Sequence, residues 1–217
     1  MVGMRRQLEY SVLFILTVAL VALALLAKLY PYFPLDLAVT IFVQQFRSPQ
    51  ADKLMEMISI LGSEPMVVAL SAGGFLTLFL VMKKQKEALM LFLSVGGMMA
   101  IGEVLKKMVS RPRPDGALIT QIGQYLGRDS FPSGHVLFFM GFFGFLACLA
   151  YLRLRGRNRR VVLSLLILLL ILIGVSRIYL GAHWFSDTLG SYLIGVLWLY
   201  LVVVRFGPRL PDNLKLF

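Results

Sequence analysis

The chain has 217 residues, of which 59% are hydrophobic and only 15% are charged. Charged residues make up about a quarter of an ordinary globular chain, so the composition excludes a soluble domain and predicts an integral membrane protein. The net charge of +11 does not indicate nucleic-acid binding, because the basic residues lie in short loops between apolar segments, as membrane topology requires. A single cysteine, Cys148, excludes an intrachain disulfide.

Six apolar segments each have about the 20 residues that a helix needs to cross a bilayer: 10–30, 64–82, 87–105, 134–152, 161–180 and 184–204. The first is longer than a signal-peptide core and further spans follow it, so we expect it to be retained. Residues 35–62 are too polar to span, but apolar residues recur at helical spacing on both sides of Ser48-Pro49 and indicate one or two helices in the membrane interface. No internal repeat occurs, so we expect one all-α, polytopic domain over residues 1–217.

Lysines and arginines in the short loops predict how the chain is oriented in a cell membrane. One side holds 13 of the 22 basic residues, namely Arg5, Arg6, Lys83, Lys84, Lys86, the five arginines of 153–160, Arg205, Arg209 and Lys215. We therefore expect both termini in the cytoplasm. The loop between the third and fourth spans breaks the rule, because it places five basic residues on the external face. Binding an anion is one reason for such a charge.

The first polar stretch at this face, 106–114, begins with Lys106 and ends with Arg113-Pro114. Prolines on both sides of Arg113 stiffen the backbone around it. Its planar guanidinium can bind two phosphate oxygens at once, while a lysine supplies a point charge. Glu103, one turn before Lys106, is expected to be a structural partner of a neighbouring lysine rather than a catalytic acid. Taken alone, the stretch could equally be a basic loop that meets lipid head groups.

The second polar stretch, 132–135, reads Pro-Ser-Gly-His and directly precedes the fourth span. Ser133 is a favourable N-cap, and Gly134 lets a ligand approach the backbone closely. The free N–H groups at the start of a helix attract anions, and His135 would stand beside the bound group. The alternative is a plain helix cap with an interfacial histidine.

The third polar stretch, 176–187, places Arg177, His183 and Asp187 at the seam between two spans. An ionisable residue at membrane depth indicates a functional site by default, although a short solvated loop is the alternative. His183 and Asp187 are four residues apart and would share a helix face. The carboxylate could then accept the proton of one imidazole nitrogen and leave the other free to attack. Together the three stretches offer what phosphoryl transfer without a metal needs, which is positioning and stabilisation of charge.

These residues resemble the three-part signature of the type-2 phosphatidic acid phosphatase family, which also contains the vanadium-dependent haloperoxidases. The signature consists of a lysine, six residues and Arg-Pro, then Pro-Ser-Gly-His, then Ser-Arg, five residues, His, three residues and Asp. Arg113 is the matching arginine, because the lysine position that corresponds to Arg111 holds Val104.

The resemblance implies a role for each matching residue. His183 would attack phosphorus and form a phosphohistidine, and Asp187 would orient it. His135 would protonate the leaving group and then activate water. Lys106, Arg113, Ser133, Gly134 and Arg177 would bind the phosphoryl oxygens. No metal or cofactor is implied, and no obligate protein partner.

The leading hypothesis is therefore a membrane enzyme that removes a terminal phosphate from a lipid in the bilayer. Phosphatidylglycerol phosphate, phosphatidic acid and undecaprenyl diphosphate all present such a phosphate; the resemblance favours the first of them, and access to an external site favours the last. Transfer of the phosphate to another lipid or sugar is a second possibility. A non-catalytic carrier or sensor of anionic lipids would explain the arginines but not the pair His183 and Asp187. A haloperoxidase fits least, because those relatives are soluble.

Overall fold

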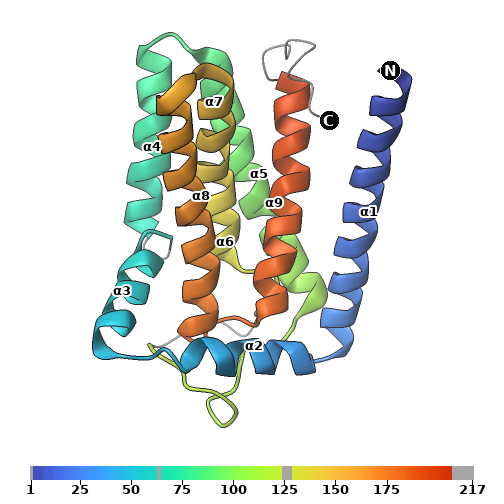
Figure 1. Cartoon of the computed structure of the whole chain (residues 1–217), viewed down its shortest axis with the longest axis vertical. Helices are drawn as coiled ribbons and strands as arrows, with labels where there is room; N and C mark the ends of the chain where they lie inside the picture. The colour runs from blue at the N-terminus through green and yellow to red at the C-terminus, as the bar shows by residue number, and fades with distance from the viewer. Residues whose placement is uncertain (1, 63–64, 124–128, 207–217) are drawn as a thin grey trace.

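The chain folds into a bundle of roughly parallel and antiparallel helices, with the short helix α2 (Pro34–Gln44) across one end (Figure 1). This computed structural model describes residues 2–62, 65–123 and 129–206. The helices are α1 (Val2–Leu29), α2 (Pro34–Gln44), α3 (Pro49–Ile60), α4 (Pro65–Val81), α5 (Gln85–Val109), α6 (Gly134–Phe139), the π-helix η1 (Met140–Gly144), α7 (Phe145–Arg153), α8 (Gly156–Tyr179) and α9 (Phe185–Phe206). The described residues form no extended strand, so the predicted all-α class is confirmed.

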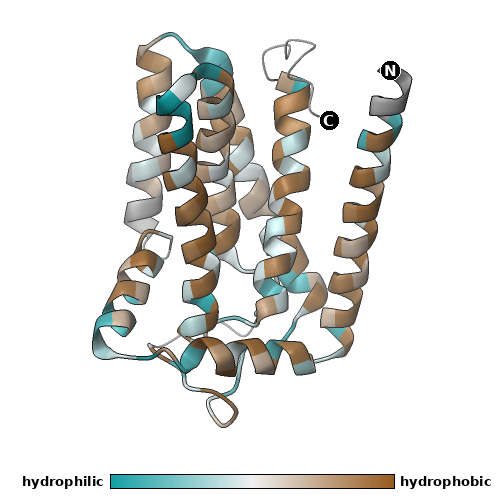
Figure 2. Cartoon of the chain, viewed as in Figure 1, coloured by the Kyte–Doolittle hydropathy of each residue, from teal (hydrophilic) through white to brown (hydrophobic). Residues whose placement is uncertain are grey.

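Five segments are long and apolar enough to span a membrane, namely Gln7–Leu29, Gln85–Val109, Gly134–Arg153, Gly156–Tyr179 and Phe185–Phe206. The third comprises α6, η1 and α7 in one unbroken run. These helices confirm five of the six predicted spans and make the chain a multi-pass membrane protein. The remaining one corresponds to α4, an apolar helix of 17 residues at the lower limit for crossing a bilayer. Figure 2 shows hydrophobic bands along the helices and hydrophilic residues mainly at their ends.

The predicted interfacial segment forms two helices that meet at Ser48-Pro49. Pro49 occupies the first turn of α3, and the Ser48 hydroxyl accepts a hydrogen bond from Ala51 N at 3.2 Å, which is how a serine begins a helix. In Figure 1, α2 lies across the end of the bundle and α3 rises beside α8. The polar stretches 106–114 and 176–187 lie at this end, whereas the start of α1 and the end of α9 lie at the other. Arg209 and Lys215, two of the basic residues on which the predicted membrane orientation is based, fall outside the described residues.

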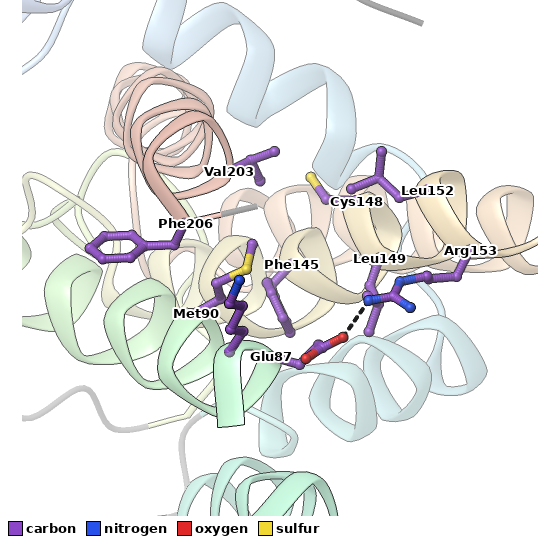
Figure 3. Close-up of a pocket in the computed structure, with 10 residues that line it drawn as sticks. Glu87, Met90, Phe145, Cys148, Leu149, Leu152, Arg153, Val203 and Phe206 are labelled. Carbon is purple, nitrogen blue, oxygen red and sulfur yellow. Dashed lines mark hydrogen bonds and ion pairs between the residues drawn. The ribbon is translucent and has the colours of Figure 1, made fainter. Parts of the chain in front are cut away.

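The end of the bundle far from α2 carries a separate pocket, which Figure 3 shows. Glu87 and Arg153 form an ion pair of 2.5 Å on its wall, and apolar side chains of α5, α7 and α9 make up most of its lining. Its lining includes no residue of the three predicted site stretches, so these stretches must be sought at the opposite end.

Small residues set the distance between α5 and α9. A Cβ atom on Gly97 would lie 2.3 Å from the indole ring of Trp198, whose Nε1 donates to the carbonyl of Leu93 at 2.9 Å. The neighbouring Gly96 has no atom within 4 Å of such a Cβ. Gly97 therefore permits close packing of the two helices, and Gly96 does not take part.

We expect Gly97→Ala to destabilise the folded protein by about 1–3 kcal/mol, the usual cost of forcing extra volume into a packed core. The apparent melting temperature in detergent, followed by tryptophan fluorescence, would measure the effect. Gly96→Ala is the matched control, since it brings the same gain in helix propensity without the clash. Equal melting temperatures for the two variants would contradict this account of the interface.

Candidate active site

The long connection between α5 and α6 brings the first two polar stretches together. Helix α5 ends at Ser110, which has a left-handed backbone (φ 51°) and turns the chain back toward the bundle. The backbone N–H of Ser130 then donates to the carbonyl of Arg111 at 2.8 Å, and Pro112 pairs with Asp129. The two ends of the connection are thus held side by side, so that Arg113 and the start of α6 belong to one site.

Lys106 lies in the last turn of α5 and points toward the start of α6. Its Nζ is 2.9 Å from Glu103 Oε1, which confirms that Glu103 is a structural partner. A Cβ atom on Gly134 would lie 3.5 Å from the same Nζ, so Gly134 leaves room for a group between the lysine and the helix start. The predicted phosphate-binding Lys106 and Gly134 are therefore neighbours.

Ser133 precedes α6, as predicted, but its hydroxyl does not cap the helix. The prediction of a side-chain cap is therefore wrong; the backbone N–H of Ser133 donates to Ser191 Oγ at 2.8 Å, and that hydroxyl donates to the carbonyl of Asp187 at 2.8 Å. Ser133 Oγ and His135 Nε2 are buried without a hydrogen-bond partner among the described residues. Buried polar atoms are rarely left unpaired, so two of them at one helix start indicate a place for a polar ligand.

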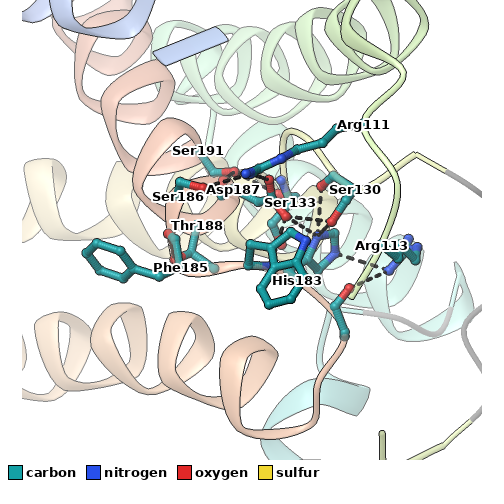
Figure 4. Close-up of polar contacts among 12 residues, drawn as sticks. Arg111, Arg113, Ser130, Ser133, His183, Phe185, Ser186, Asp187, Thr188 and Ser191 are labelled. Carbon is teal, nitrogen blue, oxygen red and sulfur yellow. Dashed lines mark hydrogen bonds and ion pairs between the residues drawn. The ribbon is translucent and has the colours of Figure 1, made fainter. Parts of the chain in front are cut away.

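His183 does not lie on a helix, contrary to our expectation, because α9 begins only at Phe185. The turn before it needs a left-handed residue, Gly181 (φ 68°), and packs so tightly that a Cβ there would meet the carbonyl of Thr120 at 2.5 Å. The imidazole is 2% exposed and lies among polar side chains of the connection and of α9 (Figure 4). The backbone turn, rather than helical spacing, places His183 next to Asp187.

The closest acceptor for the His183 ring is a backbone oxygen. The carbonyl of Ser130 is 2.8 Å from Nδ1, whereas the nearest Asp187 oxygen is 3.8 Å away. The expected direct hydrogen bond from His183 to Asp187 is therefore replaced by one to the Ser130 carbonyl. Because a carbonyl only accepts, Nδ1 carries the hydrogen and Nε2 keeps its lone pair. Asp187 instead accepts from the Ser130 hydroxyl at 2.5 Å and from Trp184 N at 2.9 Å.

Two arginines of the predicted set surround this histidine. Arg113 Nη1 donates to the carbonyl of Ala182 at 2.9 Å and lies 3.4 Å from His183 Nε2. Arg177 is 2% exposed, and its Nη1 donates to the hydroxyl of Ser59 on α3. The charges of Lys106, Arg113 and Arg177 also act on the ring of His135. The structure thus brings together the residues of all three predicted stretches.

Known proteins resemble this chain in sequence and in fold. Residues 87–210, more than half of the chain, match the PAP2 superfamily. The chain belongs to the PAP2 superfamily. Over 173 residues it is 28% identical to phosphatidylglycerophosphatase B of Bacillus subtilis (strain 168), a match that covers 77% of this chain and 81% of that protein. Family membership and the apolar helices place it, in broad class, among the membrane lipid phosphatases.

Two solved structures share the fold of this PAP2 protein. The crystal structure of the first transmembrane PAP2 type phosphatidylglycerolphosphate phosphatase from Bacillus subtilis superposes with a TM-score of 0.70 at 24% identity, covering 89% of this chain and 98% of that one. Aquifex aeolicus LpxE superposes with a TM-score of 0.64, also at 24% identity, covering 79% and 96%. Both likenesses extend the family fold beyond the matched residues, into the N-terminal helices.

Sequence reasoning missed a set of residues behind the PAP2 site. Arg111 is buried and lies between Asp36 on α2 and Asp187 on α9, at 2.9 and 2.6 Å. Ser130 and Ser59 were missed as well. One signal in the sequence could have found the pair, because two charged residues had no assigned role. Arg111 stands outside the family signature, and Asp36 is the one acid in the apolar start of the interfacial segment.

Burial is the main cause of an unusually low pKa for His183. Removal from water disfavours the charged ring, Asp187 acts in the opposite direction, and Arg113 and Arg177 lower the pKa further, so that it falls from 6.5 to about 4. His183 is therefore neutral at physiological pH. The pKa of His183 is lower in the folded state than in the unfolded chain. As the pH drops from about 6.5 to about 4, the unfolded chain therefore binds a proton that the folded protein does not, and the free energy of unfolding falls.

We expect the His183 ring to titrate with a midpoint near pH 4. The chain has only two histidines, so NMR of histidine-labelled His135→Asn protein, purified without a histidine tag, isolates the signal of His183. A midpoint near the ordinary value of about 6.5 would show that the ring is open to water and that the buried geometry is wrong. The unlabelled protein, followed by circular dichroism, supplies the range of pH over which the fold persists.

Proposed function

We propose that this PAP2 protein hydrolyses the terminal phosphate of a membrane lipid through a phosphohistidine on His183, without a metal. The observation that carries the proposal is the tautomer fixed by the Ser130 carbonyl, which holds Nδ1–H and leaves Nε2 free at 3.4 Å from Arg113 Nη1. A lone pair aimed at a site lined by arginines is what in-line attack on a phosphoryl group requires.

In the first step, His183 Nε2 would form a bond to phosphorus while the bond from phosphorus to the lipid oxygen breaks. Lys106, Arg113 and Arg177 would balance the charge on the phosphoryl oxygens, with Ser133 Oγ as a further donor. His135 would give a proton to the leaving oxygen. In the second step, His135 would take a proton from water, which displaces the histidine and releases inorganic phosphate.

Phosphatidylglycerol phosphate is the substrate that we propose first, because the named relative from Bacillus subtilis is a phosphatidylglycerophosphatase. The second candidate is undecaprenyl diphosphate. The charge distribution of the loops supports it, since both termini would lie in the cytoplasm and the site at the external face, where a polyprenyl diphosphate would be within reach.

We expect His183→Ala to lower phosphate release by at least about 10³-fold, since loss of a nucleophile leaves only binding and charge stabilisation. The assay measures phosphate released in detergent, with a chelator present, from phosphatidylglycerol phosphate, phosphatidic acid and undecaprenyl diphosphate. Acid-labile, base-stable phosphate on the protein after rapid quenching would identify the intermediate. His135→Asn should slow both the formation and the hydrolysis of this species, because His135 would serve as the acid in the first step and as the base in the second.

Three results would contradict parts of this proposal. Activity in His183→Ala would exclude the phosphohistidine, and activity lost with the chelator but restored by a metal would exclude the metal-independent reaction. Phosphate that appears on an added lipid or sugar instead of in solution would show that the protein is a phosphotransferase.

A further inference from the structure

The most extensive buried polar network in the described part of the chain joins α2 to the candidate nucleophile. Asp36 Oδ2 accepts from Arg111 Nη2 at 2.9 Å, from Ser186 Oγ at 2.8 Å and from Phe33 N at 3.0 Å, while Asp36 Oδ1 accepts from Ser186 N at 2.8 Å. Arg111 Nη1 donates to Ser186 Oγ at 2.7 Å and to Asp187 Oδ1 at 2.6 Å. The side chains of Asp36, Arg111 and Asp187 are all at most 1% exposed.

Resting on the function proposed above, we propose that Asp36 and Arg111 are positioning residues for the attack by His183. Neither belongs to the family signature, and Asp36 lies outside the matched residues 87–210. The two act through Asp187, whose second oxygen accepts from the Ser130 hydroxyl and from Trp184 N. Ser130 in turn holds His183 Nδ1 by its carbonyl.

The geometry explains why this arrangement fixes the histidine. The guanidinium of Arg111 is planar and holds one carboxylate on each arm, so it sets where Asp187 Oδ1 lies and leaves Oδ2 directed toward Ser130 and Trp184. Ser130 contacts the imidazole through its backbone carbonyl, and Trp184 follows His183 in the sequence. A shift of Asp187 would therefore be transmitted to the ring, and small displacements of a nucleophile cost rate rather than affinity.

The charges of the three side chains suggest a decisive set of variants. Two carboxylates and one guanidinium give a buried net charge of −1. Arg111→Gln alone would leave two buried carboxylates facing each other, which endangers folding. Asp36→Asn combined with Arg111→Gln keeps the net charge at −1, leaves polar side chains at both positions, and removes the guanidinium from Asp187.

The experiment compares wild type, Asp36→Asn and the double variant, using the lipid of the panel that wild type hydrolyses fastest. We expect kcat of the double variant to fall roughly 10- to 100-fold, as when a charge-assisted hydrogen bond is lost, and trapping of phosphohistidine to slow in proportion. KM should change less than about threefold, because Lys106, Arg113 and Arg177 remain in place. Asp36→Asn alone should show a smaller fall in kcat.

Asp52→Asn is the matched control on the same interfacial segment. Asp52 accepts from Arg47 at 3.0 Å and from the Tyr179 hydroxyl at 2.5 Å, and neither partner is one of the predicted site residues. Its partner Arg47 is 31% exposed, and an ion pair of this kind contributes little to stability. The kcat of Asp52→Asn should remain within about twofold of wild type.

Histidine NMR supplies a readout that does not depend on turnover. In the His135→Asn background, the nitrogen shifts of His183 should report the Nδ1-protonated tautomer, and adding the two network substitutions should produce a mixture of tautomers. If the network had a purely structural role, the double variant would have a lower thermal stability. The tautomer of His183 would then be unchanged, and kcat would equal that of wild type.

A folded double variant with wild-type kcat and an unchanged tautomer would overturn the inference and leave the proposed function intact. No phosphate release from wild type on any lipid would instead sink the proposed function, while the tautomer measurement would still decide the positioning role. Should the double variant fail to fold, Arg111→Lys takes its place. It keeps the charge but cannot hold two carboxylates in a fixed plane, and a lower kcat with a mixture of His183 tautomers would support the inference, whereas wild-type kcat and an unchanged tautomer would overturn it.

Discussion

The structure depends on one buried guanidinium, that of Arg111, held between Asp36 and Asp187. Removing these charges from water costs several kcal/mol per ion, and packed apolar side chains would often be at least as stabilising. What the network provides is geometry. It fixes α2 across the end of the bundle, ties the connection after α5 to the start of α9, and places the carboxylate that supports His183. The fold and the site therefore share a single polar core.

The interfacial helices also form part of the wall of the site. Gln44 at the end of α2 donates to the carbonyls of Thr120 and Tyr179, and Ser59 on α3 accepts from Arg177. A Cβ on Gly62, just after α3, would lie 3.3 Å from the His135 ring. Charged groups at the edge of a bilayer need protein around them, and α2 and α3 supply it. A segment that appeared merely amphipathic in the sequence thus packs against the candidate site.

Most of the fold and the members of the site could be predicted from local patterns. Hydropathy located the spans, and the spacing within each polar stretch identified Lys106, Arg113, His135 and His183, because these signals are contained in a few consecutive residues. The Asp36–Arg111 pair could not be found in this way, since its members are 75 positions apart and pair only after folding. The acceptor of Nδ1–H was missed for a similar reason: it is a backbone carbonyl, which leaves no mark on residue identity.

Three arginines and one lysine lie in or beside the candidate site, and their partners separate two roles. Arg111 faces two buried carboxylates, so its charge is fully compensated and it has little attraction left for a phosphate dianion. Arg113 and Arg177 donate to neutral oxygens, those of Ala182 and Ser59, and Lys106 pairs with Glu103, which is 58% exposed and screened by water. All three act electrostatically on the ring of His135. Arg113 and Arg177 also lower the pKa of His183 further, and under the proposed function the same charges would attract the dianion of a phosphate monoester.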